Sequence, residues 1–294
     1  MLGLGSNLTK VNKLVLSPTT DNLVLKHDYQ LRPVQPLSNG AAYFDGTNDY
    51  IDFGSDSTLD VGTNQFAAMC WFNPSTISSH VAIMTKGLGL GSVPYDDKGW
   101  AVTIYGTNNT MYFDVYAGTD GGSPEDIRLS ANAADGAYGD LANAGGANKW
   151  YHVTVTRTTS GNDSIYAIYL DGVLVDTSTG THAVDGSGSD ALDATGTIND
   201  ASNNLRLGVT KTTSQDFTGY ICNFGYWVGG TLDQTQIKSI MWKQYANLTT
   251  TEKSNLVGWW NLDSQVGSDG NAGTGYVLNE VAGAGSATNI GTLT

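Results

Sequence analysis

The stretch that decides the fold is Trp150-Tyr151-His152-Val153-Thr154-Val155-Thr156-Arg157, in which side chains alternate with a period of two. That period is typical of a β-strand with one face against a core. Residues 160–163 turn the chain, and an apolar run follows at 165–170. Asp171-Gly172 then predicts a two-residue hairpin, because both central positions of a type I′ turn need positive φ. Val173-Leu174-Val175 completes a three-stranded meander.

Short apolar segments of the same kind recur on both sides of this meander. Further strands are expected at 43–45, 50–53, 66–72, 81–85, 100–105, 110–117, 205–208, 219–228 and 256–262. The run 66–72 is apolar throughout and Pro74 follows it, which indicates a central strand. Ten or more short strands at this spacing predict an all-β fold, a two-sheet antiparallel jelly-roll sandwich.

The periodicity changes near the C-terminus, where one or two short helices are expected. Asp233 is the predicted N-cap of the first. Its apolar stripe would be Ile237, Ile240, Met241 and Tyr245. Thr249-x-x-Glu252 has the pattern of a capping box for a second, shorter turn.

Three parts are expected along the chain: a semi-extended N-terminal arm at 1–40, a jelly-roll domain at 41–265, and a Gly-rich C-terminal segment at 266–294. Two stretches inside the domain, 118–148 and 179–203, are rich in Gly, Ala, Asp, Ser and Asn. Loops longer than about 12–15 residues in a compact domain are usually functional or disordered. We expect both stretches to be long, outward-facing loops.

Composition excludes several classes of protein. The 294 residues carry a formal net charge of −14. This charge argues against a nucleic-acid partner, because affinity for phosphate depends on Lys and Arg. No run approaches 18 apolar residues, so no membrane insertion is expected. Residues 1–5 lack the basic segment of a signal peptide, which predicts synthesis in a cytoplasm, and the two cysteines are expected as buried thiols.

Four motifs follow one another along the chain. They are 44–51 (Phe-Asp-Gly-Thr-Asn-Asp-Tyr-Ile), the strand 66–72, the pair 150–157 and 169–175, and Leu207-Gly208 followed by 217–221. In this order they resemble the laminin-G-like (pentraxin-like) branch of the concanavalin A-like lectin/glucanase superfamily, over about residues 41–245. The resemblance implies a jelly roll of two curved antiparallel sheets. Residues 1–5 and 248–263 also resemble, in style, virion-associated proteins of this kind from phages of marine bacteria.

Glucanases of this superfamily use a Glu-x-Asp-x-Glu strand, and retaining hydrolysis needs two carboxyl groups about 5–5.5 Å apart. Of the 28 acidic residues only Glu125, Glu252 and Glu280 are glutamates, and they lie far apart in the sequence. His152 is expected to be a packed strand residue and not a base. We therefore predict that the protein is not an enzyme.

The resemblance also implies a calcium site at the rim of one sheet. Pentraxins place an acidic pair where this chain has Asp96 and Asp97, and an acidic cluster where it has Gln215 and Asp216. Ca²⁺ prefers oxygen ligands of these kinds, so the four residues form a candidate calcium site. The alternative is that the aspartates are ordinary turn residues.

Sugar sites combine exposed aromatic rings with a few polar groups. Tyr95 and Trp100 are the candidate glycan contacts. Tyr138 and Trp227 are further candidates. The tryptophans expected in the core are Trp71, Trp150 and Trp259.

Two functions remain open at this point. The first is a non-catalytic structural or decoration protein of a bacteriophage virion, on the capsid or tail surface, in contact with host-surface glycans. Its partners would be other phage structural proteins and further copies of itself, since symmetric assembly favours a homo-oligomer. The second is a free carbohydrate-binding lectin or adhesion module, with or without calcium.

Overall fold

The computed structural model describes residues 40–87, 99–107, 109–120, 123–131, 141–160, 163–178, 198, 200, 203–210, 215–263, 276–277, 279–281 and 287–290. The predicted arm lies outside these residues except for Gly40, and so does most of the stretch 179–203. In the described part of the chain, no helix is long and apolar enough to cross a bilayer.

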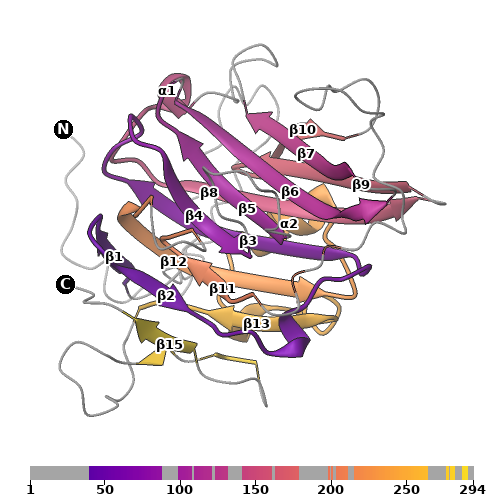
Figure 1. Ribbon diagram of the computed structural model, residues 1–294. Helices are drawn as coiled ribbons and strands as arrows, with labels where there is room; N and C mark the ends of the chain where they lie inside the picture. The colour runs from indigo at the N-terminus through magenta and orange to yellow at the C-terminus, as the bar shows by residue number, and fades with distance from the viewer. Residues whose placement is uncertain are drawn as a thin grey trace, which may run out of the picture. The chain divides into compact units, whose positions relative to one another are not determined.

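Two antiparallel sheets face each other, which confirms the predicted all-β sandwich (Figure 1). The first sheet has seven strands. Its order is β1 (Ala42–Asp45), β12 (Thr218–Val228), β3 (Phe66–Pro74), β8 (Tyr151–Ser160), β9 (Asp163–Leu170) and β10 (Val173–Thr177), with β13 (Leu256–Trp260) also paired to β12. The predicted central position of 66–72 is therefore correct, since β3 has a neighbour on each side.

The second sheet has eight strands. Its order is β14 (Tyr276–Val277), β15 (Ala287–Ile290), β2 (Tyr50–Asp52), β11 (Leu205–Leu207), β4 (Val81–Lys86), β5 (Gly99–Tyr105), β6 (Thr110–Asp120) and β7 (Ser123–Ala131). β14 and β15 come from the Gly-rich stretch 266–294, so part of that stretch completes the sheet beside β2.

The sequence predicts a long loop at 118–148, and the structure corrects this. β6 continues to Asp120, and β7 and a short helix, α1 (Leu141–Ala144), follow inside the stretch. β7 is an edge strand with β6 as its sheet neighbour, and its Leu129 reaches the core. An edge strand of this kind needs few apolar residues, because little of it faces the core. The composition of β7 therefore resembles that of a loop.

The main core lies between the sheets and follows the period-two pattern. In β8, Tyr151, Val153 and Val155 face this core. His152 and Thr154 face the outer side of the seven-stranded sheet, yet both are fully buried. Something must therefore cover part of that outer side.

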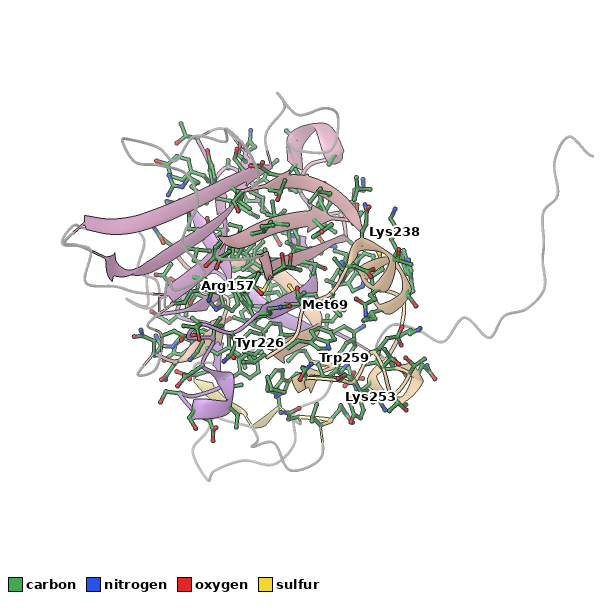
Figure 2. All side chains as sticks on the ribbon, turned by 90° about the vertical axis from the view of Figure 1, so that its right-hand side faces the viewer. Met69, Arg157, Tyr226, Lys238, Lys253 and Trp259 are labelled. Atoms are coloured by element: carbon green, nitrogen blue, oxygen red, sulfur yellow. The ribbon has the colours of Figure 1, made fainter. Side chains whose placement is uncertain are left out.

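The cover is α2 (Gln234–Ile240) together with the chain that follows it, including the 3₁₀ turn η4 (Tyr245–Asn247). The predicted cap is confirmed: the Asp233 side chain accepts from the Gln236 N–H, and Gln236 reaches back to the Asp233 N–H. A second apolar cluster forms beneath, from Ala67, Met69, Trp227, Leu232, Ile237, Ile240, Leu248, Leu256 and Trp259. Figure 2 shows Met69 and Trp259 inside the molecule and Lys238 of α2 on its outer side.

Candidate functional site

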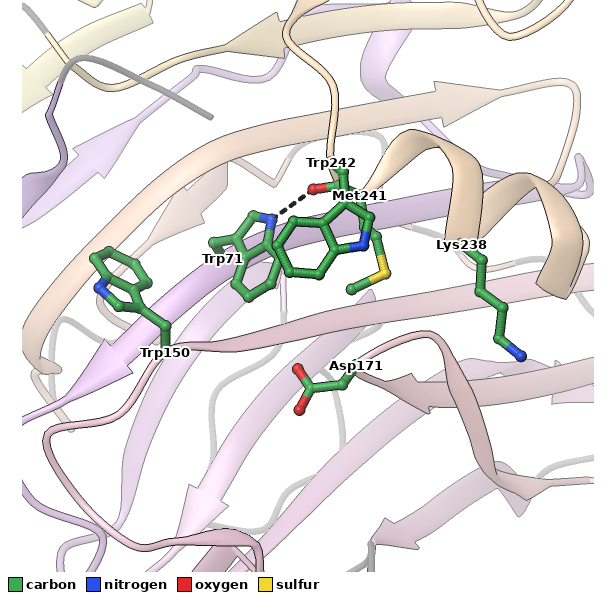
Figure 3. A pocket seen from close by; sticks show the side chains of 6 residues that line it. All are labelled: Trp71, Trp150, Asp171, Lys238, Met241 and Trp242. Atoms are coloured by element: carbon green, nitrogen blue, oxygen red, sulfur yellow. Dashed lines mark hydrogen bonds between the residues drawn. The ribbon is translucent and has the colours of Figure 1, made fainter. Parts of the chain in front are cut away.

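Where the cover ends, a pocket of about 550 Å³ opens on the outer side of the seven-stranded sheet. Its described lining consists of Trp71, Trp150, Asp171, Lys238, Met241 and Trp242 (Figure 3). These six residues come from β3, from the residue before β8, from the β9–β10 turn, and from the C-terminal end of α2 with the two residues after it. Three of the six are tryptophans.

Trp71 forms the floor of the pocket. Phe72 faces the main core, so strand alternation directs Trp71 to the outer side, where its exposed fraction is 6%. Its Nε1 donates a hydrogen bond of 2.7 Å to the Met241 carbonyl oxygen, which ties β3 to the end of α2. The Trp242 ring lies 4.9 Å from the Trp71 ring, centroid to centroid, and 62% of Trp242 is exposed. The pocket thus has a fixed indole floor and an open indole wall.

Asp171 supplies the acid of the pocket. It and Gly172 have φ values of 49° and 74°, and they connect Leu170 of β9 directly to Val173 of β10, which confirms the predicted hairpin. Asp171 Oδ1 accepts a 2.8 Å hydrogen bond from the backbone N–H of His152. Figure 3 shows the carboxylate directed toward the space between Trp150 and Trp71. Desolvation by the surrounding side chains raises the pKa of Asp171, while the His152 N–H and the charge of Lys149 oppose that shift.

His152 lies next to the floor and stabilises it. Its ring packs edge-on against Trp71, with centroids 5.2 Å apart. Burial without a charged partner lowers the pKa of His152 to about 3, so the imidazole is neutral at neutral pH. The expectation that His152 is a packed strand residue is therefore confirmed, because the ring is completely enclosed.

Exposed aromatic rings continue from the pocket across the sheet. The Trp150 ring is 6.4 Å from that of Tyr220 in β12, and Tyr220 is 5.0 Å from Tyr43 in β1. The exposed large apolar side chains of the described residues are Tyr105, Trp150, Leu174, Tyr220 and Trp242. Three of these five lie along this one surface, which we call the aromatic track: Trp242, Trp150 and Tyr220. Exposed apolar surface gathered in one place commonly marks a binding site.

The predicted calcium residues are divided between described and undescribed parts of the chain. Asp96 and Asp97 lie outside the described residues. Gln215 Nε2 lies 3.3 Å from His80 Nδ1. Burial raises the pKa of Asp216, and the charge of Asp45 adds to that shift.

Two described carboxylates whose charges act on the Asp216 site, Asp45 and Asp49, serve a turn. Asp49 Oδ2 accepts from the Asp45 N–H, and Asp45 Oδ1 accepts from the Thr47 N–H, so these carboxylates are engaged in the turn. Within the ranges that the structure describes, no group of three or more His, Cys, Asp or Glu residues is arranged to hold a metal ion. The calcium site therefore stays a prediction that depends on Asp96 and Asp97.

One of the two predicted glycan contacts, Trp100, needs correction. Tyr95, like Tyr138, lies outside the described residues. Trp100 is fully buried between the sheets, 5.3 Å from the Phe66 ring, because β5 turns it toward the core. Trp227 is also buried. Neither side chain is accessible to a glycan.

The structure also differs from the prediction for one of the tryptophans expected in the core. Trp259 is buried as predicted, but Trp150 is 39% exposed. Sequence reasoning missed Trp150, Tyr220 and Trp242 as surface residues. One signal was available for Trp242: it follows Met241 but does not belong to the apolar stripe of the helix. The two cysteines are buried thiols, as expected.

Comparisons with known proteins give one family match. Residues 45–238 match the model of the family described as the concanavalin A-like lectin/glucanases superfamily. A search of curated protein sequences finds no match.

Solved structures give several weaker matches. A Bacteroides ovatus protein provisionally assigned to carbohydrate binding has a TM-score of 0.49 at 16% identity, over 85% of this chain and 57% of that one. The heptameric SAP-like pentraxin of Limulus polyphemus has a TM-score of 0.43 at 14% identity, over 70% and 82%. The CBM40 of Ruminococcus gnavus IT-sialidase, bound to α2,3-sialyllactose, has a TM-score of 0.43 at 12% identity, over 69% and 99%. The chain thus spans little more than half the length of the Bacteroides protein.

Proposed function

Because the chain belongs to the concanavalin A-like lectin/glucanase superfamily, we propose that it is a non-catalytic carbohydrate-binding protein whose sugar site is the pocket beside α2. The observation that carries this proposal is the combination of an exposed tryptophan, Trp242, with the carboxylate of Asp171 across one open pocket. Family membership alone would leave the function open, since one fold supports many functions.

The chemistry of the pocket suits a pyranose ring. A sugar has an apolar face of C–H groups, which stacks on an aromatic ring, and a rim of hydroxyl groups, which need hydrogen-bond partners. Trp242 and Trp150 offer the aromatic faces, and they have one indole N–H each to donate. Asp171 offers an acceptor, because Oδ1 alone is held by the His152 N–H. The few polar groups among apolar walls match the usual composition of a small-molecule site.

The acids of the described residues support binding without hydrolysis. Asp171 is the single carboxylate in the described lining, whereas glycoside hydrolysis uses a pair. Glu252 Oε1 accepts from Lys243 Nζ and from Ser239, and Oε2 accepts from the Thr249 N–H. That glutamate is fully engaged in the turn after α2, as its capping-box sequence predicts.

A glycan array tests the proposal. Purified protein should bind a defined subset of glycans, and Trp242→Ala should abolish the signal. Tyr105→Ala is the matched control, because Tyr105 is an exposed aromatic residue on the other sheet. No binding to any glycan, or equal losses in the two variants, would overturn the pocket as a sugar site. Release of shortened products from a bound glycan would overturn the non-catalytic assignment.

The same array tests calcium. We propose Asp96, Asp97, Gln215 and Asp216 as the residues that would hold the ion, on the resemblance to pentraxins. Binding that EDTA abolishes and added Ca²⁺ restores would support a calcium-dependent site. Binding that is indifferent to EDTA would exclude calcium from glycan recognition.

The setting in which the protein acts is a separate proposal. We propose that it decorates the capsid or tail of a bacteriophage virion as a homo-oligomer, made in the host cytoplasm, and contacts host-surface glycans. Its support is the resemblance of residues 1–5 and 248–263 to virion-associated proteins. Mass spectrometry of purified phage particles should find the chain, and its absence from particles would overturn the virion role without affecting the sugar site.

A further inference from the structure

The aromatic track points to the shape of the ligand. We infer that the site takes a linear, extended glycan of several rings that reaches from Trp242 past Trp150 to Tyr220. This inference rests on the proposed function, since it assigns the ligand class of the same site. It differs from a pocket for one terminal sugar in requiring Tyr220, which does not line the pocket.

The residues of the track are far apart in the sequence and meet through the pocket and one ring pair. Trp242 follows α2, Trp150 precedes β8, and Tyr220 lies in β12. Trp150 joins the two ends: it lines the pocket, and its ring is 6.4 Å from Tyr220 at an interplanar angle of 44°. Tyr43 supports Tyr220 from the neighbouring strand, with ring centroids 5.0 Å apart. The rings of Trp150, Tyr220 and Tyr43 therefore form a row that leaves the pocket across β3 and β12 to β1.

Exposure separates the track from ordinary packing. Trp242, Trp150 and Tyr220 are 62%, 39% and 43% exposed, whereas the tryptophans beneath α2, Trp227 and Trp259, are at most 1% exposed. Transfer of apolar surface out of water is favourable by roughly 25 cal/mol per Å². The three exposed aromatic side chains therefore do not contribute the burial energy that Trp227 and Trp259 contribute on the same sheet. A ligand that stacks on them would bury this surface and gain that energy on binding.

Each end of the track also has a polar group for a sugar hydroxyl. Asp171 serves the pocket end. At the other end, Asn73 of β3 lies directly opposite Tyr220 of β12, so the two side chains share a face. The Asn73 amide makes no side-chain hydrogen bond to the described residues, and it is partly exposed. An aromatic ring with a polar side chain beside it thus occurs at two places on this surface.

The extended shape follows from the spread of the rings, which are tilted against one another by 44° to 52° and lie on separate parts of the sheet. A β-1,4-linked chain of glucose or N-acetylglucosamine has equatorial linkages and extends as a ribbon whose successive rings present apolar faces. An α-1,4-linked chain coils and can reach fewer of these rings at once. We therefore expect cello- and chito-oligosaccharides to bind better than α-1,4-linked gluco-oligosaccharides of equal length.

The experiment measures affinity against chain length by calorimetry, with these three series from two to six rings. We expect affinity for a β-1,4-linked series to rise with length and then level off. Tyr220→Ala should lower affinity for the hexasaccharide about three- to tenfold, the range expected for one stacking contact, and leave the disaccharide unchanged. Trp242→Ala should weaken both lengths, and Tyr105→Ala neither.

The outcomes separate the two proposals. Equal affinity for two and six rings, a preference for the α-linked series, or no effect of Tyr220→Ala on the hexasaccharide would overturn the track while leaving a terminal-sugar pocket intact. No binding of any glycan would overturn both. Dimerisation that Tyr220→Ala abolishes, measured by light scattering without glycan, would show a second copy of the chain on this surface and would also overturn the track.

Discussion

One half of the outer side of the seven-stranded sheet is covered by α2 and the chain after it, and the other half is open, although tryptophans lie on both. Trp227 and Trp259 are buried in the covered half, with their rings 6.1 Å apart and perpendicular. Trp242 and Trp150 are exposed in the open half. The boundary is the end of α2, where the Trp71 hydrogen bond to Met241 holds the helix against β3.

This contrast teaches that burial here depends on the path of the returning chain and not on residue type. A tryptophan under the helix stabilises the fold, whereas a tryptophan one residue beyond the helix cap is available to a ligand. Replacing a tryptophan by alanine should therefore lower stability in the covered half and glycan affinity in the open half. Four predictions test this contrast in order of decreasing effect.

The largest effect is expected for Trp259→Ala in the covered half. Removal of a fully buried indole leaves a cavity and should lower the free energy of unfolding by about 3–5 kcal/mol. The Trp259 Nε1 hydrogen bond to Asn261 Oδ1, 3.0 Å long, is lost as well. Urea denaturation followed by fluorescence measures the change. Trp242→Ala is the control and should change stability by less than about 0.5 kcal/mol, so equal losses would contradict the two-half description.

The second prediction concerns His152, which lies buried at the boundary of the halves. Its folded-state pKa of about 3 is far below the ordinary 6.5. The unfolded chain binds this proton more readily, so stability falls as pH drops below 6.5, by up to about 1.4 kcal/mol per pH unit for one proton, until the folded pKa is reached.

His152→Phe keeps a ring against Trp71 and removes the titration. At pH 7.5 the variant should be close to the wild type in stability, and between pH 6 and 4 it should lose less stability than the wild type. Urea denaturation at several pH values gives the difference between the two chains, in which most contributions of the carboxylates cancel. Parallel curves would show that His152 takes up its proton without unfolding.

Much of the fold, but little of the candidate site, could be predicted from the sequence. The alternation of 150–157 and the Asp171-Gly172 turn are local signals, and both gave the correct strands and hairpin. The run 66–72 gave a correct central strand, but because every residue in it is apolar, its pattern does not show which of Trp71 and Phe72 faces the main core. The exposure of a side chain on the outer side depends on whether α2, from a distant part of the sequence, covers it.

That dependence explains why the burial of three tryptophans was predicted wrongly. Trp100 and Trp227 were candidate glycan contacts, yet sheet packing buries the first and α2 with its following turn buries the second. Trp150 was expected in the core, but it lies before the first residue of β8, and its side chain is exposed.

The third prediction returns to the open half. Trp242→Ala should lower affinity for any glycan that binds the pocket at least about tenfold, because it removes the most exposed ring of the site. The folded structure should be unchanged, as judged by the unfolding midpoint. Trp242→Phe is the matched variant and should recover part of the affinity, since it keeps an aromatic face. Full affinity in the alanine variant would mean that ligand contacts lie elsewhere.

The smallest effect is expected for Asp171→Asn. Asparagine tolerates positive φ and Asn-Gly is a preferred type I′ turn, so the hairpin should persist. Its side-chain oxygen can still accept from the His152 N–H, so the substitution changes mainly the charge. A hydrogen bond from a sugar hydroxyl to a carboxylate is stronger than one to an amide, so affinity should fall about threefold. Because burial raises the pKa of Asp171, the wild type should also lose affinity as acid protonates this carboxyl, whereas the variant should not. Titration calorimetry at pH 7 and pH 4 measures both, and the same pH dependence in the two chains would exclude Asp171 as the acceptor.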